Sequence, residues 1–465
     1  MTFEELYRIA ASRVPAYRRF LTQRLGSVPE VVSREDFAAL PLTSKKDYVK
    51  AFPLEDLCLD GTLEGKHVLC RSSGSTGKPT YWPQMPEQER YVADYLYTDL
   101  DEDLQISLRP ALALVVLGLG SWISGELTTW GLRTLGIQKG HLTLATPGIN
   151  LEEAAEILEE FAPRFPQTVL YSYPPFAKRL LEMASDRGVD LSVLRVSLRL
   201  AGEGYSERYR DHVNRLLGYP EGHLTSVVSG YGSTDFGSAG KETPLCVAIR
   251  RALYEGNLTE KVLGVPDLPS VCQYDPAAHL LEVVEGELVA SKYQAVPLVR
   301  YRSGDRGELV PFREMMARLA DAGVDPLRVL EERGCRTDRV RELPFVLVHG
   351  RIDGGVTFFA ANILVGQVQG ALETDPVLAG AFTGAFQLRC AETEDLSSVL
   401  EIRAELRPGA TAPEDGAPRL ARELARRSTE YAAVWESNGD RALPQIVPVE
   451  AGSLYSSTKV RYLDR

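Results

Sequence analysis

One uninterrupted apolar run, Ala111–Gly118 (ALALVVLG), constrains the fold of this 465-residue chain more than any other segment. A strand that is apolar at every position must be covered on both faces, as the central strands of parallel sheets are. Further apolar runs at Thr168–Tyr173 and Leu194–Ala201 alternate with segments of helical periodicity such as 151–161. This alternation predicts an α/β fold with largely parallel sheets between about residues 60 and 240.

The rest of the chain predicts a helical start and two smaller units. Residues 1–60 show helical periodicity interrupted by prolines. Between 260 and 310, shorter strands with Gly/Asp turns indicate a small barrel-like subdomain, whereas strand and helix signals at 399–406 and 419–432 indicate an α+β segment. We therefore expect a large N-terminal domain of β-sheets flanked by helices, residues 1–350, and a small α+β C-terminal domain, residues 351–465.

Composition limits the partners and the compartment. The chain has 52 Lys and Arg against 64 Asp and Glu, a net charge of −12, which argues against binding nucleic acid or an anionic membrane because both favour a basic face. The six cysteines are scattered and form no C-x-x-C pair, which is typical of reduced thiols. No apolar run approaches the ~20 residues of a membrane span, and the start lacks a signal peptide's basic and apolar regions. We expect a cytoplasmic protein.

A loop rich in Gly, Ser and Thr follows a short apolar run, 67–70, that predicts a buried strand. Its glycines let the backbone bend so that N–H groups point at an anion, its hydroxyls add donors, and Lys78 adds a positive charge. A triphosphate suits such a loop. The P-loop pattern G-x-x-x-x-G-K-[ST] is not matched, because Pro79 follows Lys78. Taken alone, the segment is equally typical of a polar surface turn. The candidate phosphate-binding residues are Ser73, Gly74, Ser75, Thr76, Gly77 and Lys78.

Four further motifs carry groups that a nucleotide site needs. In Ser229–Asp235 (SGYGSTD), Tyr231 offers a flat ring that can cover an adenine or a substrate, Thr234 can contact a phosphate, and Asp235 can hold Mg²⁺. In Tyr301–Asp305 (YRSGD), we expect a strand to end in a turn that presents the carboxylate of Asp305. Such a carboxylate can accept hydrogen bonds from the two hydroxyls of a ribose. The motif GRID at 350–353 and Lys459 in the tail complete the set.

Each motif residue also has an ordinary structural interpretation. Tyr231 would serve as a core aromatic and Asp235 as a helix N-cap. Asp305 after a glycine is typical of a turn, and a lysine near the end of a chain is by default a solvated charge. The functional interpretation therefore depends on the motifs occurring together.

Together and in this order, the motifs resemble those of the adenylate-forming superfamily of acyl-CoA ligases, adenylation domains and luciferases, most of all its phenylacetate–CoA ligase branch. The loop at 72–80 is similar to S-S-G-T-T-G-K-P-T. The other similar segments are 40–45 to L-P-x-T-T-K, 202–204 to part of G-A-E-P, 231–235 to Y-G-x-[ST]-E, 302–305 to R-T-G-D, 350–353 to G-R-x-D, and 452–464 to G-S-[LI]-P-R-S-x-G-K-x-x-R-x-x-D. The resemblance spans nearly the whole chain.

The resemblance implies a reaction in two steps. A small carboxylic acid attacks the α-phosphorus of Mg·ATP to give an acyl-adenylate and pyrophosphate, and a thiol then displaces AMP. The thiol is usually that of coenzyme A, and in some members it belongs to a carrier protein. ATP, Mg²⁺ and CoA are therefore the expected substrates and cofactors. Relatives are often dimers, so a homodimer is expected by analogy alone.

The resemblance also implies roles for individual residues. Lys459 would bridge the acid and the α-phosphate as negative charge builds there, and Thr234 would be the second catalytic residue. Asp235 would bind Mg²⁺, and Asp353 would be the hinge of a mobile C-terminal lid. The implied ATP-binding set is Ser73, Gly74, Ser75, Thr76, Gly77, Lys78, Gly202, Glu203, Gly204, Tyr231, Gly232, Ser233, Thr234, Asp305 and Arg351.

The implied acid pocket contains Trp130, Tyr173 and Tyr231. Trp130 falls where the branch has an aromatic pocket wall, which favours an aromatic acid, although a tryptophan there is equally typical of simple core filling.

The chain departs from the branch most clearly at Phe359-Ala360, which replace an Arg-Gly pair that lies along the thiol's tunnel. The departure favours the first half-reaction over CoA transfer and leaves an enzyme that acylates a carrier protein or an amine as an alternative. A catalytically silent nucleotide-binding regulator is the alternative of another class.

Overall fold

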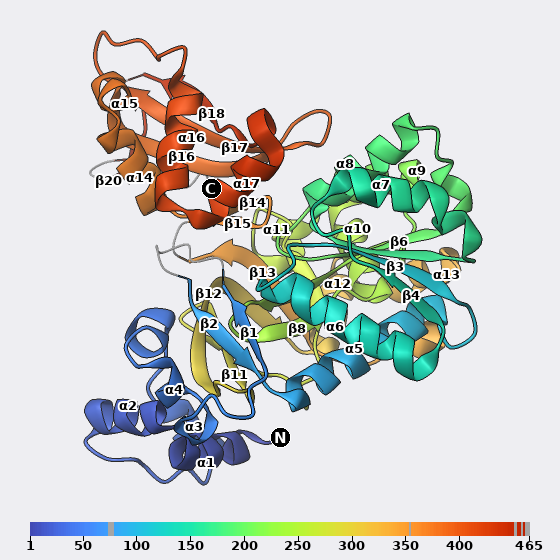
Figure 1. The fold of residues 1–465 in the computed structure, drawn as a ribbon, viewed down its shortest axis with the longest axis vertical. Helices are drawn as coiled ribbons and strands as arrows, with labels where there is room; N and C mark the ends of the chain where they lie inside the picture. The colour runs from blue at the N-terminus through green and yellow to red at the C-terminus, as the bar shows by residue number, and fades with distance from the viewer. Residues whose placement is uncertain (73–78, 353–354, 451–452, 457–458, 461–465) are drawn as a thin grey trace. The chain divides into compact units, whose positions relative to one another are not determined.

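The computed structural model describes residues 1–72, 79–352, 355–450, 453–456 and 459–460 (Figure 1). The chain's contacts divide it into two compact units. The first unit comprises Met1–Ser72 and Thr80–Gly350, and the second contains the described residues from Arg351 onward. In the described part of the chain, no helix has the length and apolar character needed to cross a membrane.

The first unit is built on an eleven-stranded sheet with the order β10-β11-β12-β13-β9-β8-β7-β6-β5-β3-β4. Five neighbouring strands are parallel: β4 (Leu142–Ala145), β3 (Ala111–Val116), β5 (Thr168–Ser172), β6 (Val196–Leu200) and β7 (Val227–Ser233). Every residue of β3, β5 and β6 is buried. The α/β fold predicted from these apolar runs is confirmed.

Helices cover both faces of the parallel strands, as the continuous apolar runs require. Helices α5 (Pro86–Leu104) and α6 (Ile123–Lys139) lie on one face (Figure 1). The opposite face carries α7 (Leu151–Glu160), α8 (Pro174–Asp186) and α9 (Glu207–Leu216) (Figure 1). The amphipathic helix predicted for 151–161 is therefore present as α7.

The other half of the sheet is mainly antiparallel. It contains β8 (Gly237–Lys241), β9 (Ser270–Gln273), β13 (Phe345–Arg351), β12 (Leu298–Val310), β11 (Glu287–Lys292) and β10 (Leu280–Val284). The short strands predicted between 260 and 310 are present, but they are hydrogen-bonded into the main sheet through β12 and β13 rather than forming a separate sheet.

Strand β12 is longer than predicted, and Asp305 lies inside it rather than in a turn at its end. Gly304 has φ +79°, a conformation that would interrupt most strands. Shifts in the register between β11 and β12 absorb this irregularity, so the strand continues to Val310.

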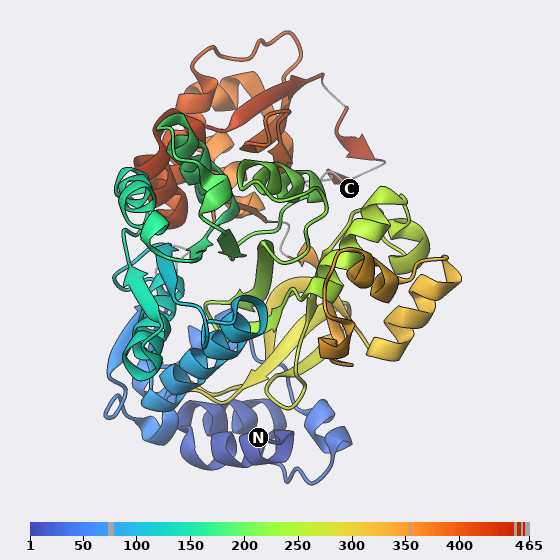
Figure 2. The ribbon, with the colours of Figure 1, turned by 90° about the vertical axis from the view of Figure 1, so that its right-hand side faces the viewer.

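The predicted helical start is confirmed. It contains α1 (Phe3–Arg13), α2 (Pro15–Leu25), α3 (Arg34–Ala39), the π-helix η1 (Lys45–Val49), α4 (Leu54–Leu57) and the 3₁₀ turn η2 (Leu59–Gly61). Leu6 and Tyr17 from these helices share a core with Leu288, Val299 and Tyr301 of the sheet, and Figure 2 shows the helices next to these strands. A second core joins β9 and β13 to α10 (Pro244–Glu255), α11 (Thr259–Leu263), α12 (Phe312–Asp321) and α13 (Pro326–Glu332).

The strand predicted before the Gly/Ser/Thr loop exists as β1 (Val68–Arg71), but the prediction that it is buried is wrong. It pairs with β2 (Tyr81–Gln84) in a separate two-stranded antiparallel sheet. Cys70 is fully buried, whereas Leu69 is 48% exposed. A two-stranded ribbon covers one face of each strand, so alternate residues face outward.

The second unit is an α+β structure. Its sheet has the order β16 (Phe382–Glu392), β17 (Ser398–Leu406), β18 (Gln445–Val449), and its helices are α14 (Val365–Thr374), α15 (Pro376–Ala381), α16 (Gly416–Arg427) and α17 (Thr429–Asn438). The helix predicted at 419–432 is two helices, because Ser428 ends α16 and its hydroxyl accepts the N–H of Tyr431 to cap α17.

A hairpin in the second unit places Phe359 and Ala360 in a strained turn. These residues connect β14 (Val356–Phe358) to β15 (Ala361–Ile363), and both have positive φ, 48° and 62°. Turns of this kind favour Asn-Gly, because a Cβ crowds the backbone in the left-handed region. The buried Glu430 of α17 accepts the N–H of Asn362, and the rings of Phe358 and Phe359 meet edge to face at 4.7 Å. Packing therefore holds the turn in place.

We expect Ala360→Gly to raise the free energy of unfolding by about 0.5–1 kcal/mol, because glycine relieves the left-handed strain at a smaller entropic cost. Urea unfolding of the two proteins measures the difference. Ala361→Gly is the matched control, since Ala361 is a buried strand residue, and it should destabilise by about 0.5 kcal/mol or more. Equal destabilisation by both variants would contradict the assignment of strain to position 360.

Candidate functional site

The SGYGSTD motif forms the hairpin between β7 and β8. Thr234–Phe236 are its turn, and the Ser233 hydroxyl accepts the N–H of Asp235 at 3.1 Å. A Cβ built on Gly232 would lie 2.5 Å from the carbonyl oxygen of Gly237, so only glycine permits the close pairing of the two strands at this point. Asp235 is therefore a hairpin residue and not the helix N-cap of the alternative interpretation.

The Asp235 carboxylate has two partners from distant parts of the chain. Its Oδ1 lies 3.2 Å from Nζ of Lys45, and its Oδ2 accepts the hydroxyl of Tyr301 at 2.6 Å. The side-chain amide of Gln294 donates to the Asp235 carbonyl at 2.8 Å. The Asp235 side chain keeps 13% exposure, so it is largely enclosed but not sealed from solvent.

Lys45 reaches this carboxylate because the residues before it run along β12. The N–H of Thr43 donates to the Arg300 carbonyl at 3.0 Å, and the N–H of Arg302 donates to the Thr43 carbonyl at 2.9 Å. The buried Thr43 hydroxyl also donates to the Val299 carbonyl at 2.9 Å. The sequence showed a resemblance at 40–45 but did not predict Lys45 as a site residue. The position of this segment beside β12 places Lys45 next to Asp235.

Tyr231 of β7 and Asp305 of β12 form a second contact, a few residues along the chain from the contact between Asp235 and Tyr301. The Tyr231 hydroxyl donates to Oδ2 of Asp305 at 3.1 Å, and the Tyr231 ring packs against Phe236 with centroids 6.0 Å apart. The Ser303 hydroxyl accepts the N–H of Asp305 at 3.0 Å. The structure thus brings the two predicted motifs, 229–235 and 301–305, together at two carboxylates.

Two other predicted segments lie at the same edge of the sheet. Tyr173 follows the last residue of β5, and Gly202–Gly204 come shortly after the end of β6. The last residues of β5 and β6 are register partners (Ser172 with Leu200), and Leu200 pairs with Ser229 of β7. Because the carboxyl ends of parallel strands meet at one edge, the segments beyond them are neighbours. This edge is where α/β proteins commonly bind ligands.

Two of the predicted acid-pocket residues differ in their surroundings. The Tyr173 hydroxyl lies 3.0 Å from the hydroxyl of Ser124 at the start of α6, and its ring meets Phe176 at 5.9 Å. Trp130 lies nearly two turns further along α6 and is partly buried. The α6 helix begins at the sheet edge, so Tyr173 lies with the other edge residues, whereas Trp130 is further from the start of the helix.

Several predicted residues cannot be placed with these. Ser73, Gly74, Ser75, Thr76, Gly77, Lys78 and the hinge residue Asp353 lie outside the described residues. Arg351 is the last residue of β13, and Lys459 lies in the short strand β20 (Lys459–Val460) of the second unit.

A buried charge network that sequence reasoning missed supports the hairpin. The N–H of Glu242 donates to the Ser229 carbonyl at 2.7 Å, and its carboxylate accepts the N–H of Ser229 at 3.1 Å and the hydroxyl of Tyr205 at 2.9 Å. Arg210 and Arg250 pair with the other carboxylate oxygen at 2.7 and 3.1 Å. Burial alone would raise the pKa of Glu242, but the two guanidinium groups hold this pKa below its ordinary value.

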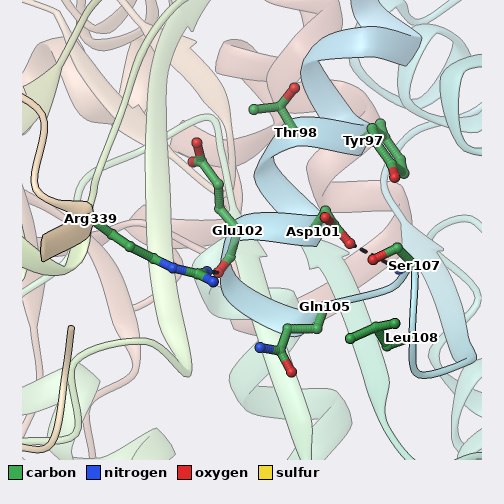
Figure 3. Close-up of a pocket in the computed structure, with 8 residues that line it drawn as sticks. All are labelled: Tyr97, Thr98, Asp101, Glu102, Gln105, Ser107, Leu108 and Arg339. Atoms are coloured by element: carbon green, nitrogen blue, oxygen red, sulfur yellow. Dashed lines mark hydrogen bonds between the residues drawn. The ribbon is translucent and has the colours of Figure 1, made fainter.

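A polar surface pocket of about 300 Å³ lies elsewhere on the first unit (Figure 3). It lies at the C-terminal end of α5, where Arg339 donates to the Glu102 carbonyl at 3.1 Å and Asp101 accepts the N–H of Ser107 at 2.9 Å. None of the predicted site residues lines it, so it is separate from the two carboxylates.

Comparison with solved structures identifies the fold. 2-Hydroxyisobutyryl-CoA ligase in complex with 2-HIB-AMP and CoA, in the thioesterification state, matches with a TM-score of 0.63 over 99% of this chain and 87% of that chain, at 15% identity. The same ligase in the postadenylation state with 2-HIB-AMP matches with a TM-score of 0.53 over the same 99% and 87%, at 16% identity. The chain has the same fold as 2-hydroxyisobutyryl-CoA ligase.

An amide bond synthetase variant from Marinactinospora thermotolerans gives a weaker match, with a TM-score of 0.48 over 98% of this chain and 80% of that chain, at 16% identity. No protein-family model and no curated protein sequence matches the chain. The fold expected from the resemblance is confirmed, and at these identities the comparisons establish the fold alone.

We expect Tyr301→Phe to lower the free energy of unfolding by about 1–3 kcal/mol, because it removes a hydrogen bond to an enclosed carboxylate. Tyr301 is 1% exposed, so water cannot easily replace the hydroxyl. Thermal or urea unfolding at pH 7 measures the loss. Tyr81→Phe is the control, since Tyr81 is 46% exposed and should change stability by less than about 0.5 kcal/mol. A Tyr301→Phe protein as stable as this control would show that the bond to Asp235 contributes nothing.

Proposed function

We propose that this chain is an ATP-dependent, AMP-forming ligase. It activates a small carboxylic acid as an acyl-adenylate and then transfers the acyl group to the thiol of CoA. The observation that carries the proposal is the pairing of the 229–235 and 301–305 motifs at Asp235 and Asp305, at the ligand-binding edge of a ligase fold. The order of the remaining motifs along the chain supports it.

In the first step, the chain's own residues bind ATP and neutralise its charge. The Asp305 carboxylate accepts hydrogen bonds from the ribose hydroxyls with help from Arg351, while the Tyr231 ring and Gly202–Gly204 lie along the adenine. The backbone and hydroxyls of 73–77, with Lys78 and Thr234, hold the phosphates. Lys459 then donates to the oxygens of the α-phosphate and the acid as negative charge develops, which lowers the barrier by electrostatic stabilisation.

Asp235 is the residue that fits a magnesium ion. Mg²⁺ binds through one or two protein carboxylates together with substrate phosphates, and among the described residues no group of three or more His, Cys, Asp or Glu side chains could hold a metal. A single carboxylate that keeps 13% exposure matches that mode of binding. When bound, the ion would screen the phosphate charges, and Lys45 would keep Asp235 oriented.

The acid pocket is proposed beside Tyr173. Its hydroxyl and that of Ser124 lie within hydrogen-bond distance and offer a polar end to a bound acid. The rings of Tyr173, Phe176 and, further along α6, Trp130 offer flat apolar walls. An aromatic acid suits this combination.

In the second step, residues 351–465 would act as a mobile lid that pivots at Asp353. Two glycines follow Asp353 in the sequence, and glycine lowers the free-energy cost of a change in φ and ψ. An acceptor other than CoA, a carrier-protein thiol or an amine, is the second candidate. The Phe359-Ala360 turn favours it, because both residues carry a Cβ at positive φ and Phe359 packs against the core of the second unit.

We expect carboxylate-dependent exchange of pyrophosphate into ATP, screened over aryl, arylacetic, hydroxy- and amino-substituted acids. Lys459→Ala should reduce this exchange by roughly 100-fold or more while ATP affinity changes little, because the lysine acts mainly on developing charge. Lys261→Ala, at an exposed position, is the control and should retain full exchange. ATP binding without exchange for any acid would overturn the proposal in favour of a silent regulator.

The acceptor is identified by single-turnover transfer from preformed acyl-AMP to CoA, a carrier protein or small amines. We expect thioester with CoA. Thioester or amide formed only with the other acceptors would reject CoA and select the second candidate. Restoring glycine with Ala360→Gly should speed transfer to CoA several-fold if the extra methyl obstructs the thiol arm.

A further inference from the structure

Tyr91, His279 and Lys292 form a cluster that the proposed reaction does not use. Tyr91 lies on α5, His279 lies in the loop between β9 and β10, and Lys292 ends β11. The Tyr91 hydroxyl lies 3.1 Å from Nε2 of His279, and Nζ of Lys292 lies 3.5 Å from Nδ1 of the same ring. The Lys292 amine also lies over the Tyr91 ring, 4.7 Å from its centroid.

These contacts require a neutral imidazole. Nδ1 can accept a hydrogen bond from Lys292 only when it carries no proton, and Nε2 then carries the proton toward Tyr91. Burial, and after it the charge of Lys292, lowers the pKa of His279 to about 4, although Asp275 acts in the opposite direction. His279 is therefore a neutral acceptor at physiological pH.

Within the described part of the first unit, Lys292 lacks the carboxylate partner that Lys45, Lys178 and Lys241 have. Lys241 lies 2.8 Å from Glu102 and 3.4 Å from Asp99, Lys178 lies 2.8 Å from Glu182, and Lys45 pairs with Asp235. Among the described residues, no carboxylate forms an ion pair with Lys292. The groups that contact it are His279 and Tyr91, and Asp275 acts electrostatically on both of these. Burial lowers the pKa of Lys292 to about 8, because an enclosed ammonium ion loses its hydration and none of the described carboxylates compensates for that loss.

We propose that Lys292 is an acylation site, at which a neutral amine held between His279 and Tyr91 attacks activated carboxylates such as acyl phosphates and acyl-adenylates. The Nζ lone pair forms a C–N bond to the acyl carbon, the bond from that carbon to the phosphate oxygen breaks, and phosphate or AMP leaves. The amine proton is released to the leaving phosphate or to water, while Nδ1 of His279 holds the amine in position. The product is an uncharged amide at Lys292.

The site is accessible enough to react. Lys292 is partly exposed, and Tyr91 beside it is 36% exposed. An acyl group replaces a charge that this position does not pair, so the modified side chain is no less suited to the cluster than the ammonium form. The acyl-adenylate of the proposed function is one source of acyl groups, but the reactivity follows from the cluster alone.

The test measures acetylation rates of individual lysines in the whole protein, with N-hydroxysuccinimidyl acetate as the probe and peptide mass spectrometry as the readout. An amine with a pKa near 8 is roughly a quarter neutral at pH 7.5, whereas an ordinary lysine is about a thousandth neutral. We expect Lys292 to react at least about 10-fold faster than the exposed Lys261 at pH 7.5, and its rate to level off above pH 8 to 9 while that of Lys261 keeps rising.

Equal rates at Lys292 and Lys261, or a Lys292 rate that rises without levelling to pH 10, would overturn the proposal. Among lysine-containing peptides, Lys292→Arg should abolish the fastest acetylation, and Lys261→Arg should retain it. Fast acetylation of another lysine in Lys292→Arg would assign the reactivity to that lysine. The reagent requires no ATP, so an absence of pyrophosphate exchange would count against the proposed function and leave this result unaffected.

Discussion

The contact that the candidate site depends on most is the Asp235 carboxylate with Lys45 and Tyr301. It joins a π-helix near the start of the chain, the β7–β8 hairpin and the longest strand of the sheet. An enclosed carboxylate costs free energy unless it is paired and hydrogen-bonded, and each of its oxygens has a partner here. The carboxylate therefore fixes the position of the hairpin turn relative to β12. The contact between Tyr231 and Asp305 lies close to it, because Tyr231 on β7 lies a few residues before Asp235 and Asp305 lies a few residues after Tyr301 on β12.

Ion pairs at the end of β8 also stabilise this hairpin. Lys241 and Glu242 are consecutive, so their side chains point to opposite faces of the sheet. Lys241 binds Asp99 and Glu102 of α5 on one face, and Glu242 binds Arg210 of α9 and Arg250 of α10 on the other. Removing one partner of such a buried pair is costly, because an uncompensated charge remains. The pairs therefore make the hairpin and the helices on both faces one structural element.

The sequence predicted best the features that depend on local pattern. The all-apolar β3 and the amphipathic α7 were found because burial on two faces, or on one helical face, leaves a direct periodicity. The position of Asp305 inside β12, the exposed Leu69 and the division of a helix at Ser428 were not predicted, since each depends on a bulge, a missing neighbouring strand or a cap. Lys45, Glu242 and Lys292 were missed as site residues for a related reason. Their roles come mainly from partners more than ten residues away, which no local pattern reveals.

The lysines of the first unit show how the same side chain takes different chemical roles. Lys45 and Lys241 lie beside carboxylates, and for Lys241 the carboxylates Asp99 and Glu102 outweigh the effect of burial, so its pKa is raised. Lys292 has a neutral ring and a phenol in their place, and burial acts unopposed. Only two residues separate it from Ala295, whose N–H donates to Gln88 of α5 at 2.8 Å, and Gln294 between them donates to the Asp235 carbonyl. The segment 292–295 thus connects a weakly basic amine to the backbone of the carboxylate hairpin. The first unit therefore contains two kinds of lysine. Lys45 and Lys241 neutralise carboxylates, whereas the amine of Lys292 loses its proton more readily than an ordinary lysine does.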